Sequence, residues 1–479
     1  MAECCETNQT SRNDESHLVI IGGGSAAFAA ATRADELGGR VTLINDGLPI
    51  GGTCVNVGCV PSKTLIRAAE FHHHAKLGRF AGIESDSRVT DFHAVIEQKR
   101  QLVEQLRQAK YVDVVAEEPS IRIIQGRARF VSPQTVAVNG EEITASRFLI
   151  ATGAAPFVPP IPGLEDAGYL TNETAFELDE LARSLIVLGG RYIALECAQM
   201  FARFGSKVTV LQRSDRILPT ETPDLTDALT SYLEEDEIEV VTGVATRSVR
   251  RGNGDVVVEA AVDGVTRQFR ASHILVATGR RPNTAGLGLE EIDAQLDEAG
   301  FVRVDKTLRT SAPGVFAAGD VVGDQMFVYT AAYEGVLAAQ NALHDASNAR
   351  DYTALPWVVF TDPQVAGVGL DEQQASKRGL EREVAVLPMS HVPRCLAARD
   401  TRGFLKLIRE PISDRLLGAR ILAPEGSELL MELCLAIKHG ITVKELALSF
   451  HAYLTLGEAV KLAAITFGKD VSKLSCCAT

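Results

Sequence analysis

The sequence predicts an α/β fold: two copies of a strand, glycine turn and helix unit, followed by an α+β carboxy-terminal domain without this unit. The first copy joins an apolar run at residues 18–21 to a glycine turn at 22–27 and an alanine-rich helical stretch. The second joins residues 185–188 to a glycine turn at 189–194 and another helical stretch. Because 479 residues exceed the size of one ordinary core, several domains are expected.

The composition is that of a soluble globular protein, with 46% hydrophobic and 23% charged residues. A formal net charge of -14 disfavours binding to nucleic acid or to an anionic membrane surface, because both are negative. No apolar run reaches the roughly 18 residues that span a bilayer. The first apolar stretch follows a polar, acidic leader instead of a basic one. We therefore expect a cytoplasmic protein without nucleic acid or membrane partners.

The nine cysteines favour local redox or metal chemistry over a secreted disulfide scaffold, because most of them are clustered. The close pairs are Cys4 and Cys5, Cys54 and Cys59, and Cys476 and Cys477. The other three stand singly in apolar surroundings and are expected to be inert core residues. These are Cys197, Cys395 and Cys434.

The first glycine turn carries a dinucleotide-binding pattern formed by Gly22, Gly24 and Ala27. Glycines permit a tight turn and close backbone approach, and the following helix presents free N–H groups to a pyrophosphate. The next strand ends at Asn45, where an acidic residue usually binds the ribose. An asparagine can still form a hydrogen bond with a hydroxyl group. The pattern predicts a Rossmann-like domain.

The second glycine turn carries a related pattern at Gly189, Arg191 and Ala194, with arginine where glycine is usual. The strand, turn and helix around it are intact, and a further strand follows at residues 207–211. That strand leads into Arg213, whose guanidinium suits a 2′-phosphate better than a diol. A second Rossmann-like domain that prefers NADPH to NADH is therefore predicted.

Two short strands ending in the dipeptides Thr152-Gly153 and Thr278-Gly279 mark candidate domain crossings, because proline soon follows each. A third such strand leads to Asp320, and a helix is expected from there to about residue 345. The predicted organisation has four parts. These are a loose arm at 1–16, a first nucleotide domain at 17–155 and 283–353, a second at 156–282, and an interface domain at 354–479.

The segment from Gly51 to Lys63 is the most specific in the chain, with Cys54 and Cys59 separated by four residues at the entry to a helix. Two cysteines at this spacing can bridge, and a helix amino terminus favours thiolate over thiol. The segment resembles the active site of the pyridine nucleotide-disulfide oxidoreductases. The resemblance extends from about His17 to Thr479.

The resemblance implies FAD and NADPH as cofactors and a redox role for the cysteine pair. Cys59 would lie against the flavin and Cys54 would face the substrate, while Lys63 and Glu196 would form an ion pair beside the flavin. The implied FAD-binding residues are Gly22, Gly24, Ala27, Asn45, Gly52, Thr53, Lys63, Thr152, Gly153 and Asp320. The implied NADPH-binding residues are Gly189, Arg191, Ala194, Arg213 and Gly279.

The carboxy-terminal motif indicates which substrates the chain takes. Family members that reduce organic disulfides carry His-x-His-Pro-Thr-x-x-Glu, whereas this chain has His451, Tyr453 and Glu458 in that frame. Tyrosine, with an ordinary pKa near 10, is a poorer base at neutral pH than histidine near 6.5. His451 matches the first histidine and is not the missing base. The motif argues against glutathione and lipoamide as substrates.

The last cysteines, Cys476 and Cys477, suit a soft metal ion better than a disulfide. Adjacent Cα atoms lie about 3.8 Å apart, below the ~4.4 to 6.8 Å usual for disulfides. Soft thiolates select soft ions such as Hg(II). The resemblance then implies a homodimer in which the tail pair of one subunit passes Hg(II) to Cys54 and Cys59 of the other. Tyr192 and Tyr453 match its two active-site tyrosines.

The expected activity is NADPH-dependent reduction of thiol-delivered Hg(II) to volatile Hg(0), a mercury detoxification reaction. One alternative is a disulfide reductase of the same fold. Another is a flavoprotein that binds Hg(II) without turnover, although Lys63, Glu196 and the second nucleotide turn argue against it. Cys4 and Cys5 could replace a metal-binding domain or be incidental. The histidines at 72–74 are expected on a solvated surface, because consecutive helical residues point to different sides.

Overall fold

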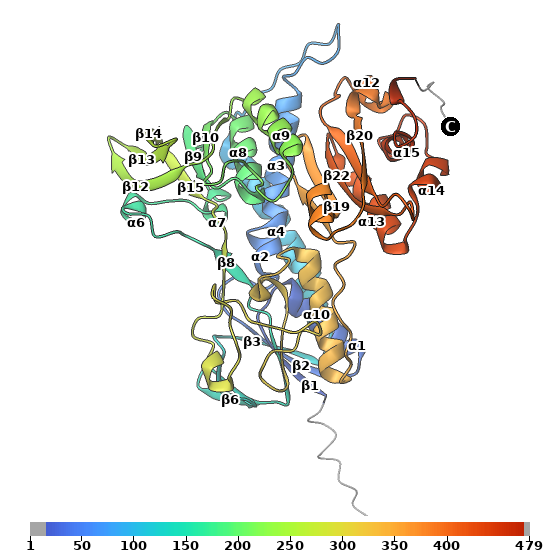
Figure 1. Cartoon of the computed structure of the whole chain (residues 1–479). Coiled ribbons are helices and arrows are strands. Elements are labelled where there is room, and N and C mark those ends of the chain that lie inside the picture. The colour runs from blue at the N-terminus through green and yellow to red at the C-terminus, as the bar shows by residue number, and fades with distance from the viewer. Residues whose placement is uncertain (1–15, 474–479) are drawn as a thin grey trace, which may run out of the picture. The chain divides into compact units, whose positions relative to one another are not determined.

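The computed structural model (Figure 1) describes residues 16–473. They form two compact units. The first unit comprises residues up to Thr64, together with Ile96–Phe157 and Gly279–Arg350. The second comprises Leu65–Val95, Val158–Thr278 and the residues from Asp351 onward. The predicted arm, except for Ser16, and the cysteines at 4, 5, 476 and 477 lie outside the described residues.

A parallel five-stranded sheet forms the centre of the first unit, in the order β17-β7-β1-β2-β3. Four of its strands are almost continuously buried, as expected for a parallel sheet covered on both faces, whereas the edge strand β3 is largely half-buried or exposed. Helices α1 and α10 pack together beside it (Figure 1), and a Cβ at Gly335 would lie 2.2 Å from the Ala26 carbonyl oxygen. The elements are β1 (His17–Ile21), α1 (Ser25–Glu36), β2 (Arg40–Asn45), β3 (Ile121–Gln125), β7 (Arg147–Ile150), β17 (Val315–Ala317) and α10 (Val328–Leu343).

Two small antiparallel sheets complete the strands of the first unit. One has the order β4-β5-β6, and the other pairs β8 with β16, where the chain crosses between the units. The sheets contain β4 (Arg129–Ser132), β5 (Thr135–Val138), β6 (Glu141–Thr144), β8 (Ala154–Pro156) and β16 (Arg280–Pro282). After β2 the chain forms α2 (Gly52–Asn56), α3 (Cys59–His74), α4 (Phe92–Arg107), a π-helix (Gln108–Val112) and α5 (Asp113–Ala116). The part of α3 from Leu65 and the part of α4 up to Val95 belong to the second unit.

The second unit contains another parallel sheet, in the order β11-β10-β9-β15, and an antiparallel sheet, β12-β13-β14. The strand predicted at 207–211 has those bounds, and the one predicted at 185–188 begins one residue earlier. The elements are α6 (Leu164–Ala167), α7 (Asn172–Ala175), β9 (Ser184–Leu188), α8 (Tyr192–Phe204), β10 (Lys207–Leu211), α9 (Pro223–Glu235), β11 (Glu239–Val241), β12 (Ala245–Gly252), β13 (Asp255–Val262), β14 (Val265–Ala271) and β15 (His273–Val276).

The carboxy-terminal part of the second unit is a five-stranded antiparallel sheet, β18-β19-β22-β21-β20, with helices packed on its core. Cys395 and Cys434 are buried there and Cys197 is buried in α8, which confirms their prediction as core residues. The elements are β18 (Pro356–Val359), β19 (Gln364–Gly369), α11 (Glu372–Lys377), β20 (Glu383–Pro388), α12 (Pro393–Ala398), β21 (Phe404–Arg409), β22 (Leu416–Ala423), α13 (Leu430–His439), α14 (Val443–Leu448) and α15 (Glu458–Ile465).

The predicted fold class is confirmed: each of two parallel sheets begins with a strand that leads through a glycine turn into a helix, and an α+β part follows. Within residues 16–473, no helix is long and apolar enough to cross a bilayer.

Candidate active site

The cysteine pair lies where α2 gives way to α3. Cys54 belongs to α2, and Cys59 is the first residue of α3, so the two thiols come from successive helices. The preceding glycines fix this segment against the first nucleotide turn. The Gly51 N–H donates to the Gly23 carbonyl oxygen at 2.8 Å, and a Cβ at Gly52 would lie 2.6 Å from the Gly24 Cα.

A hydrogen bond joins the two thiols. A hydrogen bond with Cys59, together with burial, holds the pKa of Cys54 well above its ordinary value, while the positive charge of Lys63 acts in the opposite direction. Cys59 stands at the amino terminus of α3, where the helix dipole favours thiolate. We infer that the first negative charge of the pair resides on Cys59, with Cys54 as the hydrogen-bond donor.

Tyr111, which the sequence analysis did not select, lies close to the cysteine pair. It belongs to the π-helix after α4, a distortion that often marks functional sites. Its ring meets Phe28 edge to face, with centroids 4.9 Å apart. Burial and the charges of Cys54 and Cys59 raise the pKa of Tyr111, so it is a neutral phenol beside the pair. Tyr111 belongs to no sequence motif that could have identified it.

The first nucleotide turn has the close backbone packing that its glycines predict. A Cβ at Gly22, whose φ is +127°, would lie 2.2 Å from the Ala151 carbonyl oxygen. Helix α1 begins after Gly24 without a side-chain cap, so its first N–H groups remain for a ligand. Among the described residues, the buried Thr152 hydroxyl has no hydrogen-bond partner. These features fit the diphosphate and sugar groups of a flavin nucleotide.

Asn45 is buried at the end of β2, as the predicted ribose position requires. Its amide nitrogen donates to the Leu48 carbonyl at 3.0 Å and to Gln125 at 3.3 Å. Its carbonyl oxygen faces the glycine turn, 2.2 Å from the place of a Cβ at Gly23. An acceptor therefore points toward the turn even though the usual carboxylate is missing.

Asp320 lies after β17 and is mostly buried. Burial raises the pKa of this carboxyl, and the opposing charge of Arg280 lies 3.5 Å away. This long ion pair leaves the carboxylate with capacity to accept a hydrogen bond from a hydroxyl group of a bound flavin. Asn283, which follows β16, donates hydrogen bonds to the carbonyl oxygens of Thr152 and Gly153 at 2.9 and 3.0 Å. These bonds fix the backbone at Thr152 and Gly153.

The second nucleotide turn has the same architecture. A Cβ at Gly189 would lie 2.3 Å from the Ala277 carbonyl oxygen, and Ala194 is fully buried beneath the turn. Arg191 precedes α8 with a φ of -109°, which any residue adopts, so glycine is not required there. Arg213 is exposed after β10, and within the described chain no carboxylate lies at ion-pair distance from it. This guanidinium can meet a phosphate.

The remaining predicted residues are spread over both units. Lys63 lies in the first unit and Glu196 in the second, and the Glu196 carboxylate accepts a hydrogen bond from the Phe360 N–H at 3.0 Å. Tyr192 begins α8, Gly279 follows β15 with open space around it, and Tyr453 is half exposed between α14 and α15. The Lys63–Glu196 ion pair and the tail cysteines stay predictions.

His451 is engaged through both ring nitrogens, which supports excluding it as the catalytic base. Its Nε2 lies 2.8 Å from a Glu432 carboxylate oxygen, and its Nδ1 lies 3.2 Å from the Ser449 carbonyl oxygen. The side chain is nearly buried in this arrangement. We infer that His451 joins α13 to the loop that carries Tyr453.

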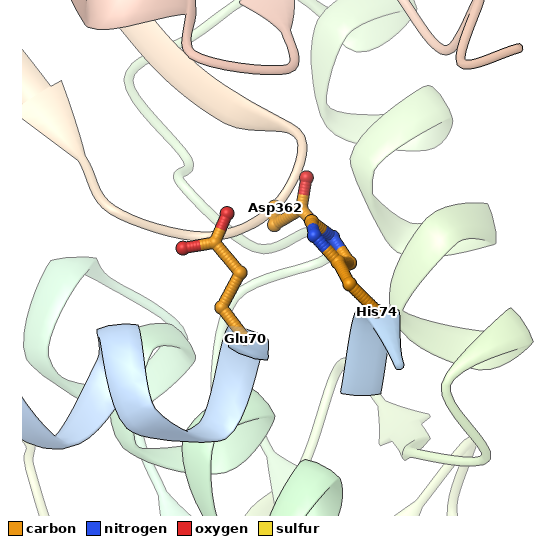
Figure 2. A group of neighbouring side chains, drawn as sticks. All are labelled: Glu70, His74 and Asp362. Atoms are coloured by element: carbon orange, nitrogen blue, oxygen red, sulfur yellow. The ribbon is translucent and has the colours of Figure 1, made fainter. Parts of the chain in front are cut away.

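A second cluster of metal-binding residue types lies at the end of α3. Glu70, His74 and Asp362 each offer a ligand atom, all within 4.8 Å of one another (Figure 2). Asp362 is, however, bound to Arg203 at 3.0 Å and to Arg402 at 2.8 Å. Glu70 is likewise paired with an arginine, at 2.7 Å. Because guanidinium charges already neutralise both carboxylates, this cluster is an ion-pair network and not a metal centre.

The same network corrects the prediction of a solvated histidine surface. His72 is buried and lies 2.7 Å from the Ser87 hydroxyl, His73 lies 3.5 Å from Asp236, and His74 lies 2.8 Å from Asp362. His73 and His74 lie close together, with ring centroids 6.0 Å apart. The prediction was wrong because residues distant in sequence cover this part of α3.

The family is decided by comparison with known proteins. The family model described as pyridine nucleotide-disulphide oxidoreductase matches residues 16–342, and the model of its dimerisation domain matches residues 355–464. The chain belongs to the pyridine nucleotide-disulphide oxidoreductase family. As a member, it is an oxidoreductase that uses FAD and NADPH, and its carboxy-terminal domain supports a homodimer.

Relatives within the pyridine nucleotide-disulphide oxidoreductases cover nearly the whole chain. The mercuric reductase of Streptomyces lividans is 47% identical over 96% of this chain and 98% of its own length. That of Staphylococcus aureus is 43% identical over 98% of this chain and 85% of its own. Among solved structures, a copper(II) complex of the flavoprotein disulfide reductase RclA from Escherichia coli is similar. It has a TM-score of 0.85 and 31% identity, covering 95% of this chain and 99% of that one.

Proposed function

We propose that this oxidoreductase reduces Hg(II) to Hg(0) with electrons from NADPH, and so detoxifies mercury. The observation that carries the proposal is the hydrogen-bonded pair of Cys54 and Cys59, held against the first nucleotide turn. Paired thiolates bind soft ions, and near full-length relatives named mercuric reductases support Hg(II) as the ion.

Binding of Hg(II) proceeds by thiolate exchange. The Cys59 thiolate attacks a mercury ion carried by two small thiols, and one carrier thiolate leaves. Cys54 attacks second, and its proton leaves with the second carrier as a thiol. The charge of Lys63 favours this deprotonation, because it lowers the pKa of Cys54.

Reduction then needs two electrons, which FAD supplies when it is bound and has received a hydride from NADPH. The overall reaction consumes NADPH and Hg(II) and yields NADP+, a proton and Hg(0). Reduction leaves both cysteines as thiolates, and Cys54 then takes up a proton, which restores the starting pair. Tyr192 takes part as a neutral phenol, because burial and the nearby Glu221 charge raise its pKa to about 12. Tyr192 and Tyr453 would act as hydrogen-bond donors around the ion, and Glu196 would support Lys63.

The nucleotide sites follow the two glycine turns. FAD would bind the first turn with Asn45, Gly52, Thr53, Thr152, Gly153 and Asp320, and NADPH would bind the second with Arg213 and Gly279. The corresponding domains would comprise residues 17–155 with 283–353, and residues 156–282, with the interface domain at 354–479. The exposed guanidinium of Arg213 supports a 2′-phosphate and therefore NADPH over NADH.

The terminal cysteines belong to the proposal as well. Cys476 and Cys477 would accept Hg(II) from a thiol complex and pass it to the inner pair of the partner subunit. A cytoplasmic location fits this chemistry, because reduced thiols persist there. In a variant with both tail cysteines changed to alanine, we expect slower turnover of Hg(II) bound to a bulky thiol.

The test is NADPH oxidation by the purified FAD-loaded protein with Hg(II) and excess small thiol, with mercury vapour trapped. Glutathione disulfide and lipoamide serve as parallel substrates. Cys54→Ala and Cys59→Ala should each abolish vapour, whereas Cys434→Ala, a matched control in the carboxy-terminal core, should retain it. Oxidation with organic disulfides alone would establish a disulfide reductase. Tight Hg(II) binding without NADPH consumption would establish sequestration.

A further inference from the structure

The only tryptophan of the chain, Trp357, contacts the start of the second nucleotide-binding helix. It lies on β18, and its ring stacks on that of Tyr192 with centroids 5.9 Å apart and planes inclined by 8°. Tyr192 is the first residue of α8, directly after the second glycine turn. Both residues belong to the second unit. A strand of the carboxy-terminal sheet thus offers an aromatic plane to the nucleotide turn.

The Trp357 ring occupies a space that the neighbouring strand leaves open. Trp357 pairs with Gly367 on β19, and Gly367 pairs with Arg420 on β22. A Cβ at Gly367 would lie 2.5 Å from the Cζ2 atom of Trp357, so no larger residue fits beneath the ring. The guanidinium carbon of Arg420 lies 5.5 Å from the ring centroid. Gly367 and Arg420 together fix where the ring can lie.

Arg420 is itself immobile, because it is almost fully buried and its nitrogens are bound. Its Nε donates to Glu221 at 2.6 Å, and its Nη1 donates to the Ala419 carbonyl oxygen at 2.9 Å. Its Nη2 donates to Gln374 at 3.3 Å. A guanidinium with these partners cannot change rotamer without leaving buried charge unpaired. The support beneath Trp357 is therefore rigid.

The stack is the first of several contacts between α8 and residues 357–362. Glu196 accepts from the Phe360 N–H at 3.0 Å, and Gln199 accepts from the Asp362 N–H at 2.7 Å. Positions 192, 196 and 199 lie on one face of a helix. The contact between Tyr192 and Trp357 is where this face reaches the nucleotide turn.

We propose that Trp357 is a positioning residue for pyridine nucleotide binding, which holds the Tyr192 ring in one orientation beside the second glycine turn. This inference rests on the proposed assignment of NADPH to that turn. A tyrosine ring without the stack would have to be ordered when the nucleotide binds, and that ordering would weaken binding. We expect loss of the contact to weaken nucleotide affinity and, through Tyr192, also to slow turnover.

The experiment uses the FAD-loaded protein and two readouts of nucleotide binding. Because Trp357 is the only tryptophan, its emission should change saturably during a titration with NADP+. NADPH affinity is measured separately by equilibrium dialysis, together with KM and kcat. In Trp357→Ala, we expect the Kd and KM for NADPH to rise about five-fold, the size of one aromatic pair contact, with flavin content retained.

Three further variants separate positioning from general damage. Trp357→Phe should restore the Kd to nearly the original value, because it keeps a flat ring. Gly367→Ala should raise the Kd as Trp357→Ala does, because it displaces the ring without removing it. Val358→Ala is the matched control, since Val358 is on the same strand but packs against the carboxy-terminal core. It should leave the Kd unchanged.

An unchanged Kd in both Trp357→Ala and Gly367→Ala would overturn the positioning role, as would an equal loss in Val358→Ala. If the original protein binds no NADPH, the proposed function fails first, and this inference fails with it. If the original protein binds NADPH tightly and the Trp357 variants bind equally well, only the positioning role fails. The dialysis measurement on the original protein distinguishes these two failures.

Discussion

Glu221 and Arg420 form a buried ion pair in the second unit, with the guanidinium Nε 2.6 Å from the carboxylate and side chains 5% and 1% exposed. Burial raises the pKa of Glu221, and the charge of Arg420 opposes that rise. Glu221 lies just before the start of α9, and Arg420 lies on β22. The pair therefore joins the start of α9 to the carboxy-terminal sheet. Its charges are costly to bury, so each depends on the other.

Arg420→Met should destabilise the protein strongly, because it removes the hydrogen-bonded charge partner of the buried Glu221. Removing one member of a buried pair costs about 3–5 kcal/mol of unfolding free energy. Urea unfolding followed by circular dichroism measures this cost. The matched control is Arg183→Met, since the exposed Arg183 pairs with Asp255 at 2.8 Å and its loss should cost at most about 1 kcal/mol. Equal losses in the two variants would contradict the prediction.

Asp362 should make stability depend on acid pH. Burial opposes its ionisation, but the hydrogen bond with His74 and the charges of Arg402 and Arg203 outweigh burial and hold its pKa well below the ordinary value. A depressed carboxyl pKa stabilises the fold above the unfolded pKa of about 3.9, and that stabilisation is lost as the pH falls below it. Asp362→Asn should therefore be less stable at pH 7.

Thermal unfolding at several pH values measures this stabilisation. The difference in thermal midpoint between the original protein and Asp362→Asn should shrink as the pH falls below about 4. Asp166→Asn changes an exposed carboxyl and is the control. Its thermal midpoint should equal that of the original protein at both neutral and acid pH. A difference that stays constant across this range would show that Asp362 acts by shape and not by charge.

The two strand, glycine turn and helix units could be predicted, because short stretches of sequence specify them. A β-branched run at 207–211 and glycines at 22 and 189 specify a strand and two tight turns without reference to distant residues. Arg191 appeared to break the pattern, yet its negative φ shows that the backbone there never needed glycine. The side-chain type was unusual, but the conformation was not.

The buried charges and the second-unit contacts could not be predicted in this way. Lys406 and Arg420 are each 1% exposed, although such residues are ordinarily assigned to the surface. Their partners, like those of His73 and His74, come from segments far away in the sequence. Tyr111 was missed for the same reason, since only the folded chain brings it to the cysteine pair.

Gly22→Ala should abolish flavin retention. The new Cβ would lie 2.2 Å from the Ala151 carbonyl oxygen, so the turn that is proposed to hold the FAD diphosphate must open. Flavin absorbance per protein after purification measures the loss. Gly47→Ala is a matched control, because Gly47 also has a positive φ, +79°, but open space around it. That variant should keep its flavin and lose only about 1–2 kcal/mol of stability.

Cys59→Ser should make Cys54 more acidic. The largest cause of the raised Cys54 pKa is its hydrogen bond with the Cys59 thiol, and the charge of Cys59 adds to it. Without that sulfur, the Cys54 pKa should fall toward its ordinary value. The rate of Cys54 alkylation by iodoacetamide, mapped by peptide mass spectrometry across pH, reports this change. An unchanged or higher midpoint would mean that burial alone sets the Cys54 pKa.

Arg213→Ala should change the choice between the two pyridine nucleotides. Arg213 is exposed at the end of β10 and, in the described part of the chain, has no acidic partner at ion-pair distance, so its charge can serve a 2′-phosphate. Removing it should raise the KM for NADPH about ten-fold or more, since a charged hydrogen bond contributes roughly 1.5–3 kcal/mol. The KM for NADH, which lacks that phosphate, should stay nearly constant. Arg183→Ala is the control, because Arg183 is exposed in the same unit but already pairs with Asp255 at 2.8 Å. Parallel increases for both nucleotides would indicate that Arg213 supports the turn and does not read the phosphate.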